Sequence, residues 1–165
     1  VSRAKDAVPL TQELLDADIV IMPLSNNEDA AEPGGGSHWS LLVFRRRGAD
    51  GKPRFEHYDS CNDANAPSAR SLMAAILPLL FAAGAQPPRT QLMRMTTPQQ
   101  ANGSDCGVYA LAISEIVCAA PVNGGAAPSE AVTMAVRGLT PEAITTMRSK
   151  WLKELQAALA PAPND

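Results

Sequence analysis

The sequence predicts an α+β domain, because most strand-like segments fall in its first third and helix-like segments dominate the remainder. The strand-like segments are 18–24, 38–46, 54–58 and 91–96, and the helix-like segments are 68–83, 105–119 and 140–160. A chain of 165 residues can form one domain and is too short for two ordinary ones. With 45% hydrophobic but only 4% aromatic residues, its core must be built mainly from Ala, Leu, Val and Met.

The first three strands are predicted from residue type and from the turn signals between them. Asp18–Leu24 contains a β-branched run and is predicted as a buried strand, followed by a loop over Ser25–Gly36. His38–Arg46 has an apolar middle, which is typical of a central strand covered on both faces. After a turn at Gly48–Pro53, the segment Arg54–Tyr58 is expected to pair with it as a hairpin.

Two helices and a short strand are predicted next. Ser68–Ala83 is helical in pattern, with Gly84 as its stop signal, and Pro78 inside it implies a kink or a break. Its shared apolar face is formed by Leu72, Ile76, Leu79 and Leu80. Gln91–Thr96 is predicted as a short strand, and Asp105–Ala119 as a second helix with apolar residues at helical spacing.

The last helix has clear boundary signals. Thr140 fits the N-cap, Pro141 the first helical position, and Glu142 the first turn. One side of this helix is expected to carry Ile144, Met147, Trp151, Leu152 and Leu155. The small-residue segment 121–129 is predicted as a loop and 161–165 as a disordered tail.

Charge and cysteine content argue against several classes of protein. Lys and Arg number 14 against 17 Asp and Glu, so no basic field points to nucleic acid. The run Arg45–Arg47 has two interpretations, a solvated strand end and a contact for an acidic partner. Three cysteines without repeating spacing do not form a disulfide framework. Neither a secretory signal nor a bilayer-spanning stretch is present, so we expect a monomer in the cytoplasm or nucleus, without membrane contact.

Cys106 is the first candidate for chemistry. It lies where a loop over Gln100–Ser104 meets the start of an apolar helix. Helix N-termini favour a thiolate, and their free N–H groups can stabilise an oxyanion. Gly107 beside it leaves room for an approaching backbone. The local pattern fits a nucleophile and a small buried apolar residue equally well.

A cysteine nucleophile needs a base, and the base needs an acceptor that orients it. The chain has two histidines, His38 at the start of a predicted strand and His57 within another. Asp59 ends the second strand of the hairpin, so His38 and Asp59 are expected to meet at one end of the sheet. His57 shares a face with Asp59 but sits deeper, which favours a paired structural histidine.

The other cysteines are weaker candidates. Cys61 follows the hairpin in a polar turn, and Cys118 lies late in a helix, where the dipole disfavours a thiolate. Structural or incidental roles are expected for both. No paired-cysteine or paired-histidine spacing indicates zinc, so we expect neither a metal nor a cofactor.

Three blocks of this sequence resemble the ubiquitin-like-protein protease family, the sentrin/SUMO-specific cysteine proteases. The blocks are Gly36-Ser37-His38-Trp39-Ser40-Leu41-Leu42-Val43-Phe44, His57-Tyr58-Asp59-Ser60 and Pro98-Gln99-Gln100-Ala101-Asn102-Gly103-Ser104-Asp105-Cys106-Gly107-Val108-Tyr109. The serine at position 40 and the final helix, from Leu139 through Arg148 to Trp151, are most similar to the deneddylase branch. The resemblance implies a papain-like fold with a small central mixed sheet flanked by helices.

The resemblance also implies a role for each matching residue. Cys106 would be the nucleophile, His38 the base and later the acid, and Asp59 the residue that orients the imidazole. Gln100, rather than its neighbour Gln99, matches the oxyanion-hole glutamine. Trp39 resembles the tryptophan that lines a narrow channel for a Gly-Gly tail, although a core aromatic is the alternative. The residues flanking the nucleophile, Asp105 and Gly107, are then expected to contact substrate.

The implied function is cleavage after the C-terminal Gly-Gly of a ubiquitin-like modifier, Nedd-type first and SUMO-type next, in precursor maturation or deconjugation. The partners would be the modifier and its conjugates. The family's N-terminal region, with its Trp-Leu-Asn-Asp motif, has no counterpart here, so we expect a remnant at 1–17, a catalytic portion at 18–160 and a tail at 161–165. Within the remnant, Leu10–Leu15 is expected to keep the end of one helix. The alternative is a truncated protein that binds the modifier with weak or no activity.

Overall fold

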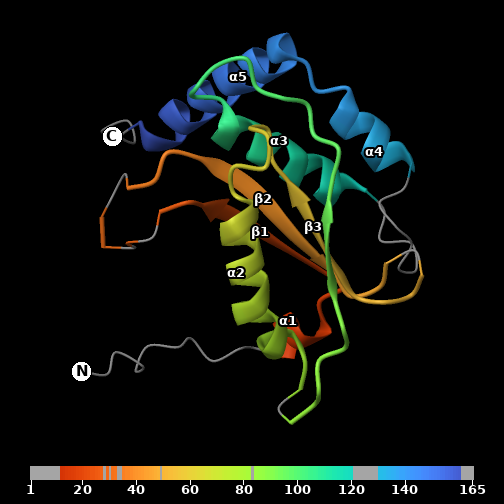
Figure 1. Ribbon diagram of the computed structural model, residues 1–165. Coiled ribbons are helices and arrows are strands. Elements are labelled where there is room, and N and C mark those ends of the chain that lie inside the picture. Colours follow the sequence, from red (N-terminus) through yellow and green to blue (C-terminus); the bar gives the residue numbers. More distant parts are fainter. Residues whose placement is uncertain are drawn as a thin grey trace, which may run out of the picture.

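A four-stranded mixed sheet lies at the centre of the computed structural model, which describes residues 12–27, 29, 31–32, 35–48, 50–82, 84–120 and 130–160. The strand order is β1 (Ile19–Ser25), β2 (Trp39–Arg45), β3 (Arg54–Tyr58) and β4 (Gln91–Arg94). The first three strands pair antiparallel, and β4 pairs parallel with β3. The predicted hairpin and the expected mixed sheet are confirmed (Figure 1).

Strand β2 is the most buried element, as its apolar middle predicted. Side chains alternate along a strand, so Leu41 and Val43 pack toward one layer of helices and Leu42 and Phe44 toward the other. All four are fully buried. Strand β1 was predicted to be buried but lies at the edge of the sheet, and most of its residues are only half-buried because it has one neighbouring strand.

The layer on the face of Leu41 contains α3 (Cys106–Ala119), α4 (Glu130–Arg137) and α5 (Pro141–Leu159). Helix α3 packs directly on the sheet, and α4 and α5 pack against α3 (Figure 1). Helix α4 was not predicted from the sequence. Its buried residues, Val132 and Val136, are spaced four apart and join the same core. The predicted loop 121–129 and tail 161–165 lie outside the described residues.

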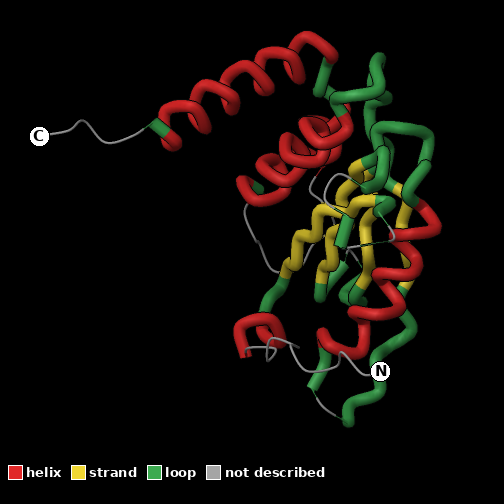
Figure 2. The backbone as a smooth tube through the Cα atoms, turned by 90° about the vertical axis from the view of Figure 1, so that its left-hand side faces the viewer, coloured by secondary structure: helices red, strands yellow, loops and turns green. Residues whose placement is uncertain are grey.

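The opposite face is covered by α1 (Gln12–Asp16), α2 (Ala66–Ile76) and the 3₁₀ helix η1 (Leu77–Leu80). Figure 2 shows the strands between helices on both sides. The break expected at Pro78 is present as the change from α2 to η1, because proline lacks the N–H that an α-helix requires. Of the residues predicted to share an apolar face, Leu80 is fully buried and Leu79 is exposed.

The arginine run was interpreted as solvated or as a partner contact, and both interpretations are wrong for its first two residues. Arg45 is buried, and its Nε donates to the Glu56 carboxylate at 2.9 Å. Arg46 is half-buried and donates to backbone carbonyls near the ends of α1 and η1, while Arg47 is exposed. The carbonyls that accept from Arg46 are those of Leu14, Ala17 and Leu80. The run therefore stabilises the fold.

Helix α5 begins as its signals predicted, because the Thr140 hydroxyl accepts a hydrogen bond from the Ala143 N–H at 3.2 Å. Its apolar side is buried only in its first half. Ile144 is fully buried, whereas Leu152 and Leu155 are 55% and 60% exposed. None of the helices in the described part of the chain combines the length and apolar composition that a bilayer crossing requires.

Candidate active site

His38 and Asp59 form a buried pair at one end of the sheet. The His38 Nε2 atom lies 2.7 Å from Asp59 Oδ1, and both side chains are nearly inaccessible to solvent. Because a carboxylate only accepts hydrogen bonds, this contact assigns a proton to Nε2, so that in the neutral imidazole Nδ1 of His38 is the acceptor. The side-by-side arrangement expected from the hairpin is present.

The Asp59 carboxylate is fixed by backbone donors from the turn that follows it. The N–H of Cys61 donates to Oδ1 at 2.8 Å, and the N–H of Asn65 donates to Oδ2 at 2.9 Å. The turn reaches this geometry through two residues with positive φ, Asn62 and Asp63. Backbone donors hold a carboxylate without side-chain entropy, so Asp59 is a rigid partner for the imidazole.

A second set of contacts holds the backbone of His38. The side-chain Oδ1 of Asn26 accepts from the N–H groups of Ser37 at 2.8 Å and His38 at 3.0 Å. The preceding Gly36 has a φ of +82°, and a Cβ there would come within 2.9 Å of Asn26 Oδ1. A glycine is therefore needed for the loop to approach Asn26 this closely.

Behind the pair lies a buried polar cluster of Asn65, Ser40 and His57. The Nδ2 of fully buried Asn65 donates to the carbonyls of Leu24 at 3.2 Å and His38 at 3.3 Å, and to the Ser40 hydroxyl at 3.1 Å. His57 Nε2 lies 3.0 Å from the same hydroxyl. Burial lowers the pKa of His57 below its usual 6.5. The paired structural histidine favoured by the sequence matches these contacts.

Cys106 is the first residue of α3 and lines a pocket of about 450 Å³. Trp39, at the start of β2, lines the same pocket and is 47% exposed, so it is not a core aromatic. Gly107 also lines the pocket, and a Cβ at that position would meet no atom within 4 Å. The structure thus brings together the thiol, the tryptophan and an unobstructed helix start next to the strand that His38 precedes.

Gln100 and Gln99 have different surroundings. The Gln100 amide accepts from the Ser60 hydroxyl at 2.8 Å and donates to the Asn102 carbonyl at 2.6 Å. Its second N–H bond has no partner among the described residues. Gln99 donates to the Asp59 carbonyl at 3.2 Å and accepts from the Asn62 N–H at 2.6 Å. Gln99 therefore supports the Asp59 turn, while Gln100 belongs to the cysteine loop.

The Asp105 carboxylate is occupied by protein donors. The Arg148 guanidinium donates to Oδ1, with Nε at 3.1 Å, and Asn102 Nδ2 donates to Oδ2 at 2.7 Å. These bonds, Arg148 first, hold the pKa of the Asp105 carboxyl below its usual value. Asp105 is buried, so its carboxylate serves the loop and helix α5 in this structure.

One group of side chains has the composition of a metal site, namely His57, Asp59 and Asp63. Each member already has a partner. His57 contacts Ser40, both Asp59 oxygens accept hydrogen bonds, and Asp63 pairs with Arg94. A cation there would have to displace these contacts, so the set is a poor fit for a metal.

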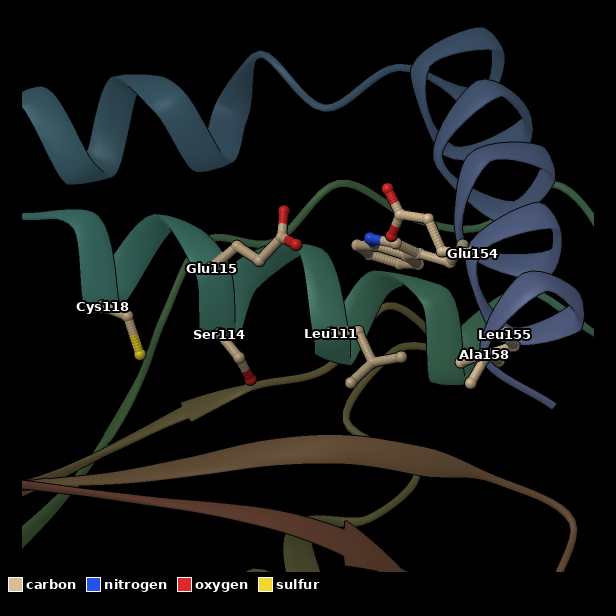
Figure 3. Close-up of a pocket in the computed structure, with 8 residues that line it drawn as sticks. Leu111, Ser114, Glu115, Cys118, Glu154, Leu155 and Ala158 are labelled. Carbon is tan, nitrogen blue, oxygen red and sulfur yellow. The ribbon is translucent and has the colours of Figure 1, made fainter. Parts of the chain in front are cut away.

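A second groove, of about 590 Å³, runs between α3 and α5. Figure 3 shows that its lining comes from these two helices only, with Leu111, Ser114, Glu115 and Cys118 on α3 and Glu154, Leu155 and Ala158 on α5. The Ser114 hydroxyl is already bonded to the Ala110 carbonyl at 2.8 Å. Among the described residues that line the groove there is no histidine, so Cys118 has no imidazole beside it there.

Two of the residues that fix the site were missed by reasoning from sequence. Asn26 and Asn65 lie outside the strands and make contacts across 12 and 27 residues to His38. The available signal was weak: Asn26 follows a strand end and Asn65 directly precedes helix α2, positions where an asparagine by itself indicates a turn or cap.

Comparison with known proteins places these features among proteases. The family model described as the Ulp1 protease family, C-terminal catalytic domain, matches residues 1–161. The probable sentrin-specific protease 8 of Dictyostelium discoideum is 39% identical over 102 residues, covering 59% of this chain and 39% of the relative. The NEDD8-specific protease 1 of Arabidopsis thaliana is 32% identical over 140 residues, covering 84% of this chain and 58% of the relative.

Solved structures support the same fold. The Rickettsia bellii effector protein RickCE superposes with a TM-score of 0.55 at 19% identity, covering 91% of this chain and 50% of that one. A mutant of Xanthomonas XopD gives a TM-score of 0.54 at 25% identity, covering 90% of this chain and 76% of that one. The chain thus spans only 39% to 58% of the length of the two curated relatives named above.

Proposed function

Because the chain belongs to the Ulp1 protease family, whose catalytic-domain model matches residues 1–161, we propose that it cleaves after the C-terminal Gly-Gly of a ubiquitin-like modifier. The observation that carries the proposal is the buried His38–Asp59 bond of 2.7 Å at the start of the strand whose Trp39 shares a pocket with Cys106. A thiol at a helix start, with an oriented imidazole at the adjoining strand end, is the arrangement that thiol peptidases use.

The chemistry follows from the hydrogen bonds of this pair. With its Nε2 proton held by Asp59, His38 uses Nδ1 to take the proton of the Cys106 thiol. The thiolate attacks the carbonyl carbon of the terminal glycine, and the resulting imidazolium returns its proton to the leaving amine as the C–N bond breaks. Water, deprotonated by the same nitrogen, then hydrolyses the thioester and frees the modifier with a C-terminal carboxylate.

The negative oxygen of the tetrahedral intermediate needs donors that are already in place. The N–H of Cys106, at the first turn of α3, is one candidate, because the first N–H groups of a helix have no partner within it. The remaining amide N–H of Gln100 is the second. Its orientation is supported by Ser60 on one side and by Asn102 on the other.

The preference for glycine rests on the pocket walls. Trp39 presents a half-exposed ring on one wall, and Gly107 supplies a wall without a side chain. A substrate backbone lacking Cβ atoms can lie against the indole, whereas a larger residue would clash with it. The modifier is proposed to be Nedd-type, because the Arabidopsis thaliana relative that matches over 84% of this chain is named as a NEDD8-specific protease.

The test uses a Nedd-type modifier and a SUMO-type modifier, each extended beyond Gly-Gly by a short peptide. We expect the chain to release the peptide from the Nedd-type protein faster, with mass spectrometry locating the cut after the second glycine. Cys106→Ser should abolish release, and Cys61→Ser, the matched control, should retain it. Folded wild-type chain that binds the modifier but releases no peptide would contradict the peptidase proposal and indicate a binding protein instead.

A further inference from the structure

Arg148 connects helix α5 to the segment directly before the candidate nucleophile. Its guanidinium donates to Asp105 Oδ1 through two nitrogens and to the Ser104 carbonyl at 2.7 Å. These contacts span 43 and 44 residues of sequence. A planar guanidinium that bonds a carboxylate and a carbonyl together fixes the direction of the chain as well as its position.

Asp105 occupies the N-cap position of α3 but does not cap the helix with its side chain. Its second oxygen accepts from Asn102 Nδ2 at 2.7 Å, and Asn102 Oδ1 accepts from the N–H groups of Ser104 at 2.9 Å and Asp105 at 3.0 Å. The Asn102 carbonyl accepts from Gln100. The Arg148 contact therefore extends through one continuous network from α5 to the glutamine of the site.

This network places a buried carboxylate one residue from Cys106. A negative charge at the start of a helix opposes a second negative charge there, which is what a thiolate would be. The guanidinium offsets that charge. The ionisable groups around this end of the site are the His38–Asp59 pair from the sheet, Asp105 from the loop, Tyr109 from α3, and Glu142 and Arg148 from α5.

We propose that Arg148 is a positioning residue for the nucleophile, holding the 104–105 segment against α5 and compensating the Asp105 charge beside Cys106. The inference rests on the proposed function, because it takes Cys106 to be the reactive thiol. In this proposal Asp105 holds the loop and does not contact substrate. Helix α5, through Arg148, affects the reactivity of Cys106 in addition to packing against α3.

The test measures the pH profile of Cys106 alkylation by iodoacetamide in a Cys61→Ser, Cys118→Ser background, where one thiol remains. Arg148→Gln leaves the carboxylate uncompensated, so alkylation at neutral pH should slow about tenfold, with the profile moved to higher pH. Asp105→Asn leaves the guanidinium uncompensated, so the profile should move to lower pH. A loop that is merely disrupted would shift both variants in the same direction.

Lys150→Gln is the matched control. It removes a positive charge from the same helix, at a residue that pairs with Glu154 at 3.8 Å, and its profile should match that of the parent. If circular dichroism shows that Arg148→Gln does not fold, the alkylation profile of Asp105→Asn tests the inference by itself. A shift of that profile to lower pH would support the inference. Profiles of Arg148→Gln and Asp105→Asn that coincide, or that move together, overturn the inference.

Failure of this inference can be told from failure of the proposed function. The modifier-processing assay on the unaltered chain tests the latter without reference to Arg148. Normal processing with no opposite shifts in the alkylation profiles would refute only the positioning role of Arg148, whereas absent processing would refute the peptidase proposal.

Discussion

Replacing Asn65 with leucine is expected to destabilise the domain strongly while keeping the number and branching of the side-chain heavy atoms. Asn65 is fully buried, and its Nδ2 serves three acceptors, the carbonyls of Leu24 and His38 and the hydroxyl of Ser40. Leucine supplies no donor, so these acceptors lose a partner in a dry environment. The backbone N–H at position 65 still donates to the Asp59 carboxylate in the variant.

The magnitude follows from counting these groups. The Asn65 amide carries two N–H bonds shared among the three acceptors, so its loss removes two hydrogen bonds at about 1–3 kcal/mol each, and the His38 carbonyl keeps a second donor in the Asn26 N–H at 3.2 Å. Removing the Oδ1 of Asn65, which is buried without a partner, returns part of that cost. We therefore expect a net loss of about 2–4 kcal/mol in the free energy of unfolding.

Urea unfolding followed by circular dichroism measures this loss, with Ser71→Ala as the control. Ser71 is a polar residue on the same helix but is exposed, so its replacement should change stability by less than about 0.5 kcal/mol. An Asn65→Leu chain that unfolds at the same urea concentration as wild type would refute the idea that the asparagine supports the backbone around His38.

Two further predictions concern the same region. Burial lowers the pKa of His57 in the folded chain below the 6.5 of the unfolded chain, so the contribution of this histidine to stability should be fully present well above pH 6.5 and should be lost as the pH falls below it. The urea midpoint should then change less between pH 8 and pH 5.5 in His57→Gln than in wild type. An equal change in both proteins would contradict the claim that His57 causes the loss of stability. Gly36→Ala forces a Cβ to within 2.8 Å of Ser25 Oγ at a φ of +82° and should cut peptidase activity at least about tenfold by moving the His38 backbone. Gly51→Ala, with a φ of +74° but open space around it, is the control for φ alone and should leave activity intact.

The sequence was sufficient for the elements that carry a local signal. The apolar run of β2, the capping residues of α5 and the break at Pro78 are each decided by residues within a few positions of one another. The meeting of His38 and Asp59 was also predictable, because a hairpin brings the two strand ends together.

What could not be predicted depends on contacts between distant segments. From sequence alone, Arg45 and Arg46 were predicted to be solvated. Only the fold shows that Glu56 and the carbonyls at the helix ends accept their hydrogen bonds. Asparagine is common in turns, so no other role was predicted for Asn65 from sequence. Only the fold reveals the three buried acceptors of its side chain. Helix α4 was missed because its short pattern follows a small-residue segment without a boundary signal.

The central claim is that Cys106 attacks the C-terminal carbonyl of a ubiquitin-like modifier, and a covalent trap tests it most directly. The chain is incubated with a Nedd-type modifier whose terminal glycine carries an electrophile, and the products are analysed by intact mass and peptide mapping. The account predicts one modifier per chain, attached at Cys106, and no adduct with Cys106→Ser. An adduct at Cys61 or Cys118, or no adduct from a folded wild-type chain, would contradict it.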